Sequence, residues 1–387
     1  MKLCVVSFKE VWRGRDNRWV TDGGFPLQMG SIASLFSETT MVLVQVPARP
    51  GGTPLPEHVR IVPIDRPVGE DLRRKISVVA HVPSYLRTIA REIRRADVVH
   101  TPLPGDISLL GLVVAQALGK RLVARYCGSW DVTSQTTTMN RVTRAWMRRT
   151  AGGRNVMLAT GDGSAPPAKG MHWIFATALS ATEIADVRPD LDRSPSSPPR
   201  LVFIGRLEAG KGLDILIDAL AQIGRAGAPP PPRVTFIGHG SLRPALERQA
   251  SDLGVAVEFT GLLRWPELSR RLLDADLCVQ PSLSEGFSKA WLDALAHGVP
   301  VIAGDVGAAR SVIGGGGARG WLVEPGSTGS LVDALDAARA SGVDWPALRR
   351  RCRTFAERHT LETWGSRIAS ICAEQWGGRV ENGRLVA

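Results

Sequence analysis

The sequence predicts an α/β protein with two doubly wound, parallel-sheet domains. Short runs rich in valine and isoleucine alternate with longer segments of helical periodicity, and this alternation is typical of β-α-β units with parallel strands. The alternation stops in a stretch rich in proline, serine and aspartate between Asp186 and Arg200 and then restarts. Such a composition is typical of a linker, and a chain of 387 residues is long enough for two cores of ordinary size.

The domain limits follow from this alternation. We expect an N-terminal domain over residues 1–190, a linker over 191–200, a second domain over 201–360 and a final amphipathic helix within 361–387. In the first half, the expected strands are Leu3–Phe8, Thr40–Val46, Val98–Thr101, Arg121–Arg125 and Met157–Ala159. In the second half, they are Leu201–Ile204, Arg233–Ile237, Val257–Phe259, Leu277–Val279 and Val299–Ile302.

Composition and cysteine usage indicate the compartment. The five cysteines are widely scattered, and no group of cysteines and histidines has the spacing of a metal site. Neither a disulfide framework nor a structural zinc ion is therefore expected. No stretch approaches the roughly 20 consecutive apolar residues that span a membrane, and the first apolar run is too short for a signal-peptide core. We expect a cytoplasmic protein.

The formal net charge of +11 is compatible with nucleic acid, anionic lipid or a phosphate-bearing substrate. Basic residues crowd the N-terminal half, from Arg87 to Arg95 and from Arg141 to Arg149. Residues Ser77 to Arg95 form a basic amphipathic pattern, for which a solvated face on a packed helix is favoured over docking to an anionic membrane surface. A nucleic-acid partner is not expected, because the arginines are not interleaved with aromatic residues and no binding-module motif is present.

A glycine-rich segment, Gly205–Gly212, follows the expected strand Leu201–Ile204 and precedes a helical run. It is nearly a P-loop, but Gly212 stands where a serine or threonine hydroxyl would hold Mg²⁺. What remains is a phosphate site made of backbone N–H groups at a helix N-terminus and of two cations, Arg206 and Lys211. Standing alone, so short a pattern would indicate only a strand-to-helix turn with two surface charges.

A second segment further along the chain carries two carboxylates. Glu285 stands in a glycine-flanked loop before an expected helix, and Asp293 lies eight positions later, near the same face of that helix. A carboxylate in the loop can accept hydrogen bonds from sugar hydroxyls, and one inside the helix can accept them from ribose hydroxyls. Buried carboxylates without such partners are costly, so the pair suggests a polyol ligand, with an exposed helix position as the alternative for Asp293.

Together these segments resemble the family 4 glycosyltransferases, the glycosyl transferases group 1, which are retaining enzymes of the GT-B fold. The resemblance runs in order from about residue 201 to 330. The family signature is a glutamate, seven residues and a second glutamate, whereas this chain has Glu285, seven residues and Asp293. The matching segments are Ile204–Leu207 with Lys211–Gly212, Ile237–Gly240, Phe259–Gly261, Ala275–Asp276, Pro281–Ser282 with Glu285–Phe287, and Ala294–Pro300.

The resemblance implies two Rossmann-like domains that face each other across a cleft, with residues 361–387 crossing back to pack on the first domain. It also implies that Arg206 and Lys211 grip the diphosphate of a nucleotide-sugar, that Glu285 binds the donor sugar and that Asp293 binds the ribose. Fixed cations and oriented amides stabilise a departing diphosphate without a metal, so no cofactor and no metal ion is expected. The further donor-binding positions implied in the second half are Gly205, Gly238, Gly286, Phe287 and Ser288.

The N-terminal half resembles the family more faintly. Gly23 and Gly24 precede a helical run, where the backbone could approach the donor phosphates, although a flexible loop before a helix would look the same. Many family members carry a histidine after the fourth or fifth strand, close to the anomeric centre, where this chain has Cys127. The candidate cleft-lining residues, none assigned as a base, are His100, Tyr126, Cys127, Gly128 and Asp131; for His100 a structural role at a strand end is favoured.

The leading hypothesis is a retaining glycosyltransferase that moves a sugar from a nucleotide-sugar to a glycan, a lipid-linked acceptor or a small molecule. One alternative is a GT-B-fold epimerase, which would need further acid and base carboxylates. The other is a non-catalytic nucleotide-sugar-binding protein, in which Asp293 and Cys127 would mark lost activity. Two Asp-x-Asp pairs, at Asp190 and at Asp274, do not stand at strand ends and are not expected to bind a metal.

The donor base, the sugar, the acceptor, the linkage and the oligomeric state are left open by the sequence. Family context and the basic N-terminal half favour a cytoplasmic role in polysaccharide, glycolipid or secondary-metabolite glycosylation, with the protein lying peripherally at the inner face of the membrane.

Overall fold

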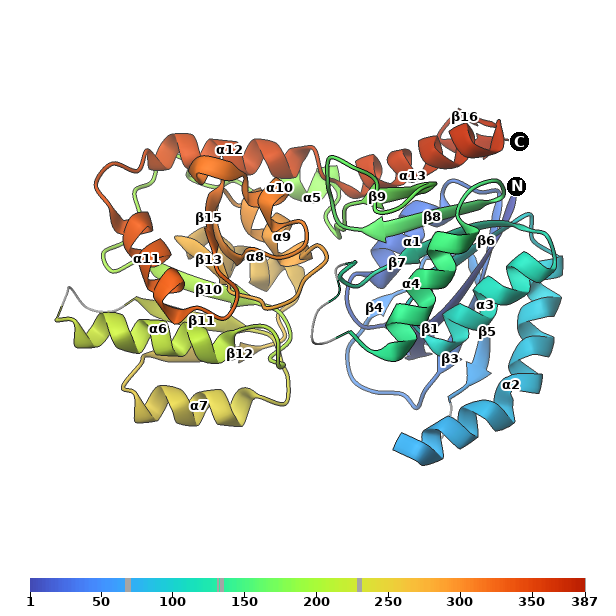
Figure 1. Cartoon of the computed structure of the whole chain (residues 1–387), viewed down its shortest axis with the longest axis horizontal. Helices are drawn as coiled ribbons and strands as arrows, with labels where there is room; N and C mark the ends of the chain where they lie inside the picture. The colour runs from blue at the N-terminus through green and yellow to red at the C-terminus, as the bar shows by residue number, and fades with distance from the viewer. Residues whose placement is uncertain (67–70, 131, 133–135, 228–231, 387) are drawn as a thin grey trace. The chain divides into compact units, whose positions relative to one another are not determined.

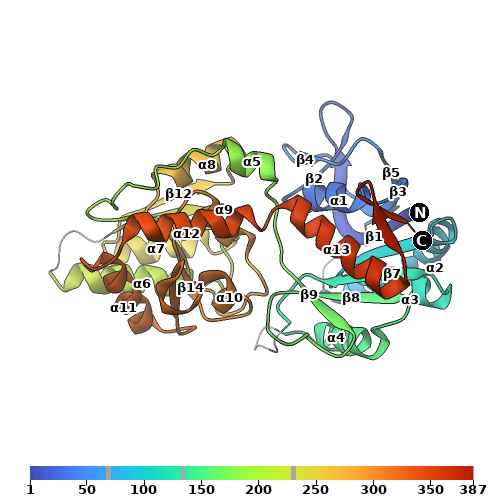
Figure 2. The same ribbon diagram turned by 90° about the horizontal axis from the view of Figure 1, so that it is seen from above.

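The computed structural model describes residues 1–66, 71–130, 132, 136–227 and 232–386, with the backbone alone for residues 71–80. The chain forms two compact α/β units (Figure 1, Figure 2). Unit 1 contains residues 1–130 and 136–178 and the C-terminal segment from residue 361 onward, and the main body of unit 2 spans residues 179–360. No helix in these described ranges is long and apolar enough to cross a bilayer.

Unit 1 is built on a parallel sheet with the strand order β5-β3-β1-β6-β7-β8-β9. The strand order reverses direction between β1 and β6, which makes the sheet doubly wound. Its strands are β1 (Lys2–Arg13), β3 (Glu38–Gln45), β5 (Val59–Asp65), β6 (Val98–Leu103), β7 (Arg121–Tyr126), β8 (Asn155–Thr160) and β9 (Met171–Ile174). Two short strands, β2 (Trp19–Thr21) and β4 (Thr53–Pro54), extend it antiparallel from the end of β1.

Helices cover both faces of this sheet because alternate residues of each buried strand point to opposite sides. Leu3 and Val5 of β1 face a core that includes helices α1 (Phe25–Ala33) and α13 (Leu361–Trp376). Cys4 and Val6 face a second core with α2 (Asp71–Arg94), α3 (Asp106–Ala117) and α4 (Thr138–Thr150). The chain ends in a hairpin of β16 (Arg379–Glu381) and β17 (Arg384–Val386).

Unit 2 has a six-stranded parallel sheet in the order β12-β11-β10-β13-β14-β15. This is the Rossmann order, with the reversal between β10 and β13. The strands are β10 (Arg200–Ile204), β11 (Arg233–Ile237), β12 (Val257–Gly261), β13 (Leu277–Gln280), β14 (Val301–Gly304) and β15 (Gly320–Val323). The helices are α5 (Ala181–Asp186), α6 (Leu213–Arg225), α7 (Arg243–Asp252), α8 (Trp265–Asp274), α9 (Lys289–Ala296), α10 (Ala309–Ile313), the 3₁₀ turn η1 (Gly315–Gly317), α11 (Thr328–Arg339) and α12 (Trp345–Glu357).

The segment 191–200, expected to be a linker, is instead an integral part of unit 2, whose main body begins at residue 179 rather than near 200. The cause is Asp276, whose side chain is fully buried. Its carboxylate accepts hydrogen bonds from Arg193 at 2.7 Å and from the backbone N–H groups of Ser196 and Arg200 at 3.1 and 2.9 Å. Arg349 lies 3.5 Å from the same carboxylate. A proline-rich segment is thus fixed because it satisfies a buried charge.

Candidate functional site

The glycine-rich segment and the Glu285 segment meet at the carboxyl ends of β10 and β13, the two strands between which the order of unit 2 reverses. In open parallel sheets this is the place where ligands bind, because the loops after the two strands diverge to opposite faces. The loop after β10 leads into α6, and the loop after β13 leads into α9. The two loops touch directly, since the backbone N–H of Leu283 donates to the carbonyl of Gly210 at 2.8 Å.

Glycines allow the loops of this edge to pack backbone against backbone. Gly212 has a φ of +66°, and a Cβ atom there would lie 2.2 Å from the carbonyl oxygen of Pro281. A Cβ at Gly238 would lie 1.8 Å from the carbonyl oxygen of Gly205, and one at Gly307 would lie 2.0 Å from that of Glu285. Gly212 therefore occupies the P-loop serine position because no side chain fits between the two loops.

Lys211 and Glu285, from the two loops, are brought together. The Lys211 ammonium donates to both carboxylate oxygens of Glu285, at 2.9 and 3.0 Å, and each side chain is only 18% exposed. The pair is held from both sides: Lys211 directly precedes the glycine that caps α6, and the Glu285 carbonyl lies against Gly307. The result is a shielded cation and a shielded carboxylate side by side at the switch point.

Arg206 is not brought to this pair. Its guanidinium forms an ion pair with Glu208 at 2.6 Å, and its side chain is 67% exposed. Exposed ion pairs of this kind contribute little to stability, so the guanidinium can leave Glu208 for a ligand phosphate at low cost.

The N-terminus of α9 supplies the backbone groups of the site. Its first residues follow Ser288, whose hydroxyl makes no capping bond, and the first turn carries no acidic side chain. Gly286 is fixed because its carbonyl accepts from the N–H of Ala308 at 2.9 Å. The positive end of the helix dipole thus points to the region of Glu285 with no carboxylate of its own first turn to neutralise it.

Gln280 is a site residue that sequence analysis missed. It is 2% exposed and ends β13. Its amide donates to the carbonyl of Ile204 at 2.7 Å and accepts from the Ser288 hydroxyl at 3.3 Å, so one side chain ties the end of β10 to the start of α9. The available signal was a polar residue at the carboxyl end of an otherwise apolar strand.

Asp293 lies half-buried on α9, and no hydrogen bond to its carboxylate occurs within the described part of the chain. Burial raises the pKa of this carboxyl group to about 7, with Lys289 lowering it and Glu183 raising it further. The Asp293 carboxyl group is therefore not exposed on the helix surface, and its hydrogen-bonding capacity is not used within the described part of the chain. A carboxylate held in this way is ready to accept hydrogen bonds from a hydroxyl-bearing ligand.

Asp293→Asn should make the free protein more stable at pH 8. Because the folded-state pKa exceeds the ordinary value of 3.8, ionisation destabilises the fold, and stability falls as the pH rises from about 4 to about 7. The variant avoids this loss, which we expect to be on the order of 1–2 kcal/mol. Urea unfolding at pH 4 and pH 8 measures it, with Asp252→Asn on exposed α7 as the control. An equal gain at both pH values would contradict the assignment.

The structure buries two of the cleft-lining candidates of unit 1, and for His100 this agrees with the structural role that the sequence favoured. His100 is fully buried on β6, and its Nδ1 contacts the carbonyl oxygen of Val123 at 3.0 Å. Burial, with the nearby Arg125, lowers the pKa of His100 to about 3. Tyr126 is 2% exposed and packs in the core with α3 and α4. Both side chains point into the sheet–helix layers because they alternate with residues of the opposite face.

The other N-terminal candidates lie at the carboxyl end of the unit 1 sheet. Cys127 is exposed directly after β7, and Gly128 follows it half-buried. Gly23 and Gly24 precede α1, where Gly23 has a φ of +73° and a Cβ atom would meet nothing within 4 Å. Helix α1 has no side-chain cap and no acidic residue in its first turn. Asp131 lies outside the described residues.

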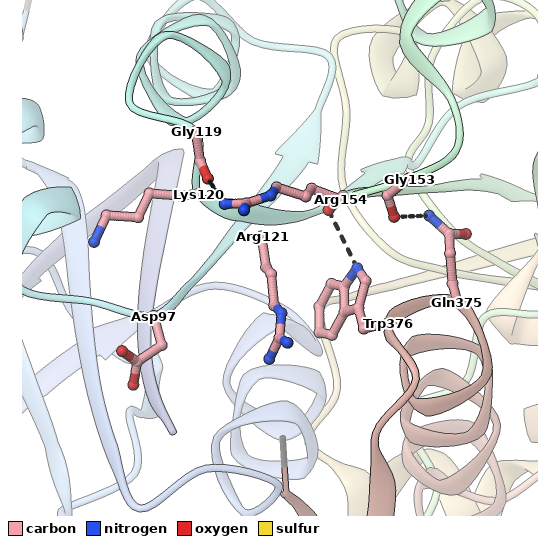
Figure 3. A pocket seen from close by; sticks show the side chains of 8 residues that line it. All are labelled: Asp97, Gly119, Lys120, Arg121, Gly153, Arg154, Gln375 and Trp376. Carbon is pink, nitrogen blue, oxygen red and sulfur yellow. Dashed lines mark hydrogen bonds between the residues drawn. The ribbon is translucent and has the colours of Figure 1, made fainter.

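A separate hollow of about 550 Å³ lies at the opposite edge of the unit 1 sheet, at the amino ends of β6, β7 and β8 (Figure 3). Its cations already have partners: Lys120 donates to the carbonyls of Arg94 and Ala96, and Arg154 donates to that of Gly119. Trp376, at the end of α13, donates to the carbonyl of Arg154 at 3.2 Å. The hollow is therefore the place where the end of the C-terminal helix packs on unit 1. It lies at the edge opposite to the one where ligands bind in parallel sheets.

Each of the two Asp-x-Asp pairs has an aspartate that forms ion pairs with arginine side chains. Asp276 is the buried partner of Arg193 and Arg349, and Asp192 forms an ion pair with Arg350. In the described part of the chain, no group of three or more histidine, cysteine, aspartate and glutamate side chains is arranged to hold a metal ion.

Two Rossmann-like units, one of which carries a phosphate-type loop at its switch point, define a protein of the GT-B fold. Residues 198–340 match the family Glycosyl transferases group 1. Among solved structures, Anabaena HepE in complex with UDP has a TM-score of 0.70 to this chain at 17% identity, over 97% of this chain and 100% of that one. The GT-B fold therefore extends over nearly the whole sequence.

Two curated proteins are similar over shorter segments. The D-inositol 3-phosphate glycosyltransferase of Nocardia farcinica is 35% identical over 162 residues, which are 40% of this chain and 35% of that protein. The GDP-mannose-dependent monoacylated alpha-(1-6)-phosphatidylinositol monomannoside mannosyltransferase of Corynebacterium glutamicum is 31% identical over 185 residues, which are 45% of this chain and 46% of that protein. The chain spans less than half the length of these relatives.

Proposed function

We propose that the protein is a retaining glycosyltransferase that moves a sugar from a nucleoside-diphosphate sugar to a hydroxyl group of an acceptor without a metal ion. The observation that carries the proposal is the shielded Lys211–Glu285 pair at the switch point of unit 2. A purely structural ion pair has no need of this position, whereas a ligand with both phosphates and hydroxyls needs a cation and a carboxylate together.

In this proposal the Lys211–Glu285 ion pair opens when the donor binds, and each side chain then contacts a different part of the donor. The diphosphate competes with Glu285 for the Lys211 ammonium, and a carboxylate oxygen becomes available to a sugar hydroxyl. Arg206 leaves its exposed contact with Glu208 and adds a second cation at the phosphates. The backbone N–H groups at the start of α9 complete the anion site.

The transfer step breaks the bond between the sugar C1 and the diphosphate oxygen and forms a bond from C1 to the acceptor oxygen on the same face. The acceptor proton passes to the departing phosphate oxygen, so the charge that the cations and amides must stabilise lies on the diphosphate. The burial of His100 and Tyr126 supports this route, because neither side chain can take the acceptor proton.

Metal independence is part of the proposal. Lys211 and Arg206 would supply the positive charge that a divalent ion supplies elsewhere, and Asp276 is already committed to two arginines.

For the acceptor we propose a glycan, a lipid-linked acceptor or a small molecule. The names of the two relatives contain an inositol phosphate and a phosphatidylinositol mannoside. Both compounds carry hydroxyl groups and a phosphate. We further propose a cytoplasmic protein that works peripherally at the inner face of the membrane.

Calorimetric titration with UDP, GDP, ADP and dTDP and with their common sugars, in the presence of a chelator, tests the donor site. One diphosphate should bind, and Arg206→Ala should weaken both the diphosphate and its sugar by about tenfold or more. Glu285→Ala should remove the extra affinity of the nucleotide-sugar over the diphosphate. Arg339→Ala, which removes an arginine paired with Asp336 on α11, is the control and should change neither.

Three results would count against the proposal. If no nucleotide binds, the donor site is wrongly placed. If a nucleotide-sugar binds but is neither transferred nor hydrolysed in the presence of acceptors, the protein is a non-catalytic binding protein. If binding or transfer disappears with the chelator and returns with a divalent ion, metal independence is wrong.

A further inference from the structure

The carboxyl end of β1 lies at the switch point of unit 1, beside β6. The strand is irregular there, because its pairing with β3 shifts register between Val6 and Glu10. The three residues Ser7–Lys9 stand opposite the single residue Leu43, and we call them the β1 bulge. Bulges are frequent next to active sites, where they change the direction of a side chain. The β1 bulge therefore stands at the edge where ligands bind in parallel sheets.

The β1 bulge is held in place from two sides. On one side, the backbone N–H of Phe8 donates to the hydroxyl of Ser108, in the first turn of α3, at 3.4 Å. On the other side, the hydroxyl of Thr21 donates to the carbonyl of Glu10 at 2.6 Å. The backbone N–H of Lys9 donates to a hydroxyl within the bulge at 3.1 Å. The backbone at Lys9 is thus fixed between the loop that precedes α1 and the start of α3.

Lys9 is the unpaired cation of a small cluster of charges. Its side chain is half-buried, and among the residues that the structure describes there is no ion pair with its ammonium and no hydrogen bond from it. The two carboxylates that act on it are held by arginines. Arg49 lies 3.2 Å from Glu10 and 3.0 Å from Asp22, and Arg66 lies 3.3 Å from Glu10. The cluster therefore has three cations for two carboxylates.

The environment of Lys9 disfavours its charge. Burial lowers the pKa of Lys9 from the ordinary value of 10.5. Asp22 opposes this shift, Arg49 adds to it and Glu10 opposes it. The net lowering means that the carboxylates do not compensate the ammonium for the water that it has lost. An ammonium in this state is stabilised when an anionic group of a ligand reaches it.

We propose that Lys9 binds an anionic group of the acceptor, a phosphate or a carboxylate. Each of the two parallel sheets has one switch point. In the proposed function, the switch point of unit 2 binds the donor diphosphate with Lys211 and Arg206, so the cation at the switch point of unit 1 is available to the second substrate. The inference rests on the proposed sugar transfer and deepens it, because it defines the acceptor as a hydroxyl compound that also carries a negative charge.

Two other roles account for Lys9 less well. A lysine can lie along an apolar surface and keep its ammonium in water, but burial would then not lower its pKa as it does here. An internal ion pair would use Glu10 or Asp22, but Arg49 contacts both. A third role, in which Lys9 contacts the donor diphosphate instead of the acceptor, is distinguished by the experiments.

Initial rates with matched acceptors test the assignment, with the donor identified by titration. The pairs are a hexose with its 6-phosphate and a methyl hexoside with the corresponding uronate. The charged member should be the better acceptor, and Lys9→Gln should raise its KM about tenfold or more but leave that of the neutral member unchanged. Lys9→Arg should recover part of the loss. Lys2→Gln, at the amino end of the same strand, where Lys2 pairs with Glu38, is the control and should change neither.

Chemical modification tests the anion site without sugar transfer. The full-length protein is acetylated with limiting reagent in chloride or in inorganic phosphate of equal ionic strength, and mass spectrometry measures each lysine. Phosphate should slow the acetylation of Lys9 about threefold or more as it approaches saturation, whereas that of Lys2 should not change. The protection should persist in Arg206→Ala, because it does not arise at the donor site.

Several outcomes would overturn the inference. Equal acetylation of Lys9 in chloride and in phosphate would remove the anion site. Protection of Lys9 by a nucleoside diphosphate that Arg206→Ala abolishes would assign Lys9 to the donor. Equal use of charged and neutral acceptors would contradict this inference alone, whereas the absence of transfer to every acceptor would contradict the proposed function. Because burial penalises the ammonium, Lys9→Gln should not weaken the fold, and a marked loss of stability in urea unfolding would make Lys9 structural.

Discussion

Lys211→Ala should lower kcat/KM for sugar transfer, or for donor hydrolysis while the acceptor is unknown, by about 10²–10³-fold. The lost group is a cation only 18% exposed, at the point where the departing diphosphate develops its charge. Lys211→Arg should recover part of the activity because it restores the charge in a different shape. Initial rates with the donor identified by titration measure both effects.

A double-mutant cycle separates this role from a structural one. If the pair only neutralises buried charge, Lys211→Ala and Glu285→Ala are each destabilising, and the double variant recovers both stability and donor binding. If Lys211 binds the diphosphate, the double variant recovers stability in urea unfolding but not donor affinity. Recovery of donor affinity in the double variant would therefore remove Lys211 from the site.

Gly212→Ala should destabilise unit 2 by about 3 kcal/mol or more and abolish nucleotide binding. Two effects add at this position: a left-handed backbone with a φ of +66°, and a Cβ atom that would lie 2.2 Å from the Pro281 carbonyl oxygen. A carbonyl of the backbone cannot rotate away as a flexible side chain can. The loop after β10 would have to separate from the loop after β13, and Lys211 would move with it.

Gly254 provides the control for this prediction. Its φ is also +66°, but a Cβ atom there would meet nothing within 4 Å. Gly254→Ala should therefore cost only the backbone term, about 1–2 kcal/mol, and leave nucleotide binding intact. Chemical denaturation and titration of both variants give the comparison. Equal destabilisation by the two substitutions would show that the contact of the loops does not matter.

The sequence predicted the central strands and the last helix well. The expected strands Leu201–Ile204 and Arg233–Ile237 lie within β10 and β11, and the final helix expected within 361–387 is α13 (Leu361–Trp376). Among the strands that it missed, β5, β9 and β15 lie at the edges of the two parallel sheets. Edge strands are only partly buried, so β5 contains Arg60 and Pro63 and lacks the continuous apolar run that marks a strand buried on both faces.

The candidate site was predicted in parts. Glycine spacing and residue type indicated Lys211 and Glu285, because phosphates call for cations and hydroxyls for carboxylates. Their mutual contact was not predicted, since it depends on the order β10-β13, which places two loops distant in sequence beside each other. Gln280 was missed for the same reason, because its hydrogen bonds connect β10 to the start of α9, and these elements are distant in sequence.

By itself, then, the sequence determined the class of fold, the main strands and the types of chemical group at the donor loops, because periodicity and glycine spacing are local properties of the chain. Only the tertiary structure decided which groups meet and which are exposed. It buried His100 and Tyr126, fixed residues 191–200 on Asp276, and covered the apolar side of α2 with the core of unit 1. These outcomes depend on which elements pack together, and packing joins residues that are far apart in sequence.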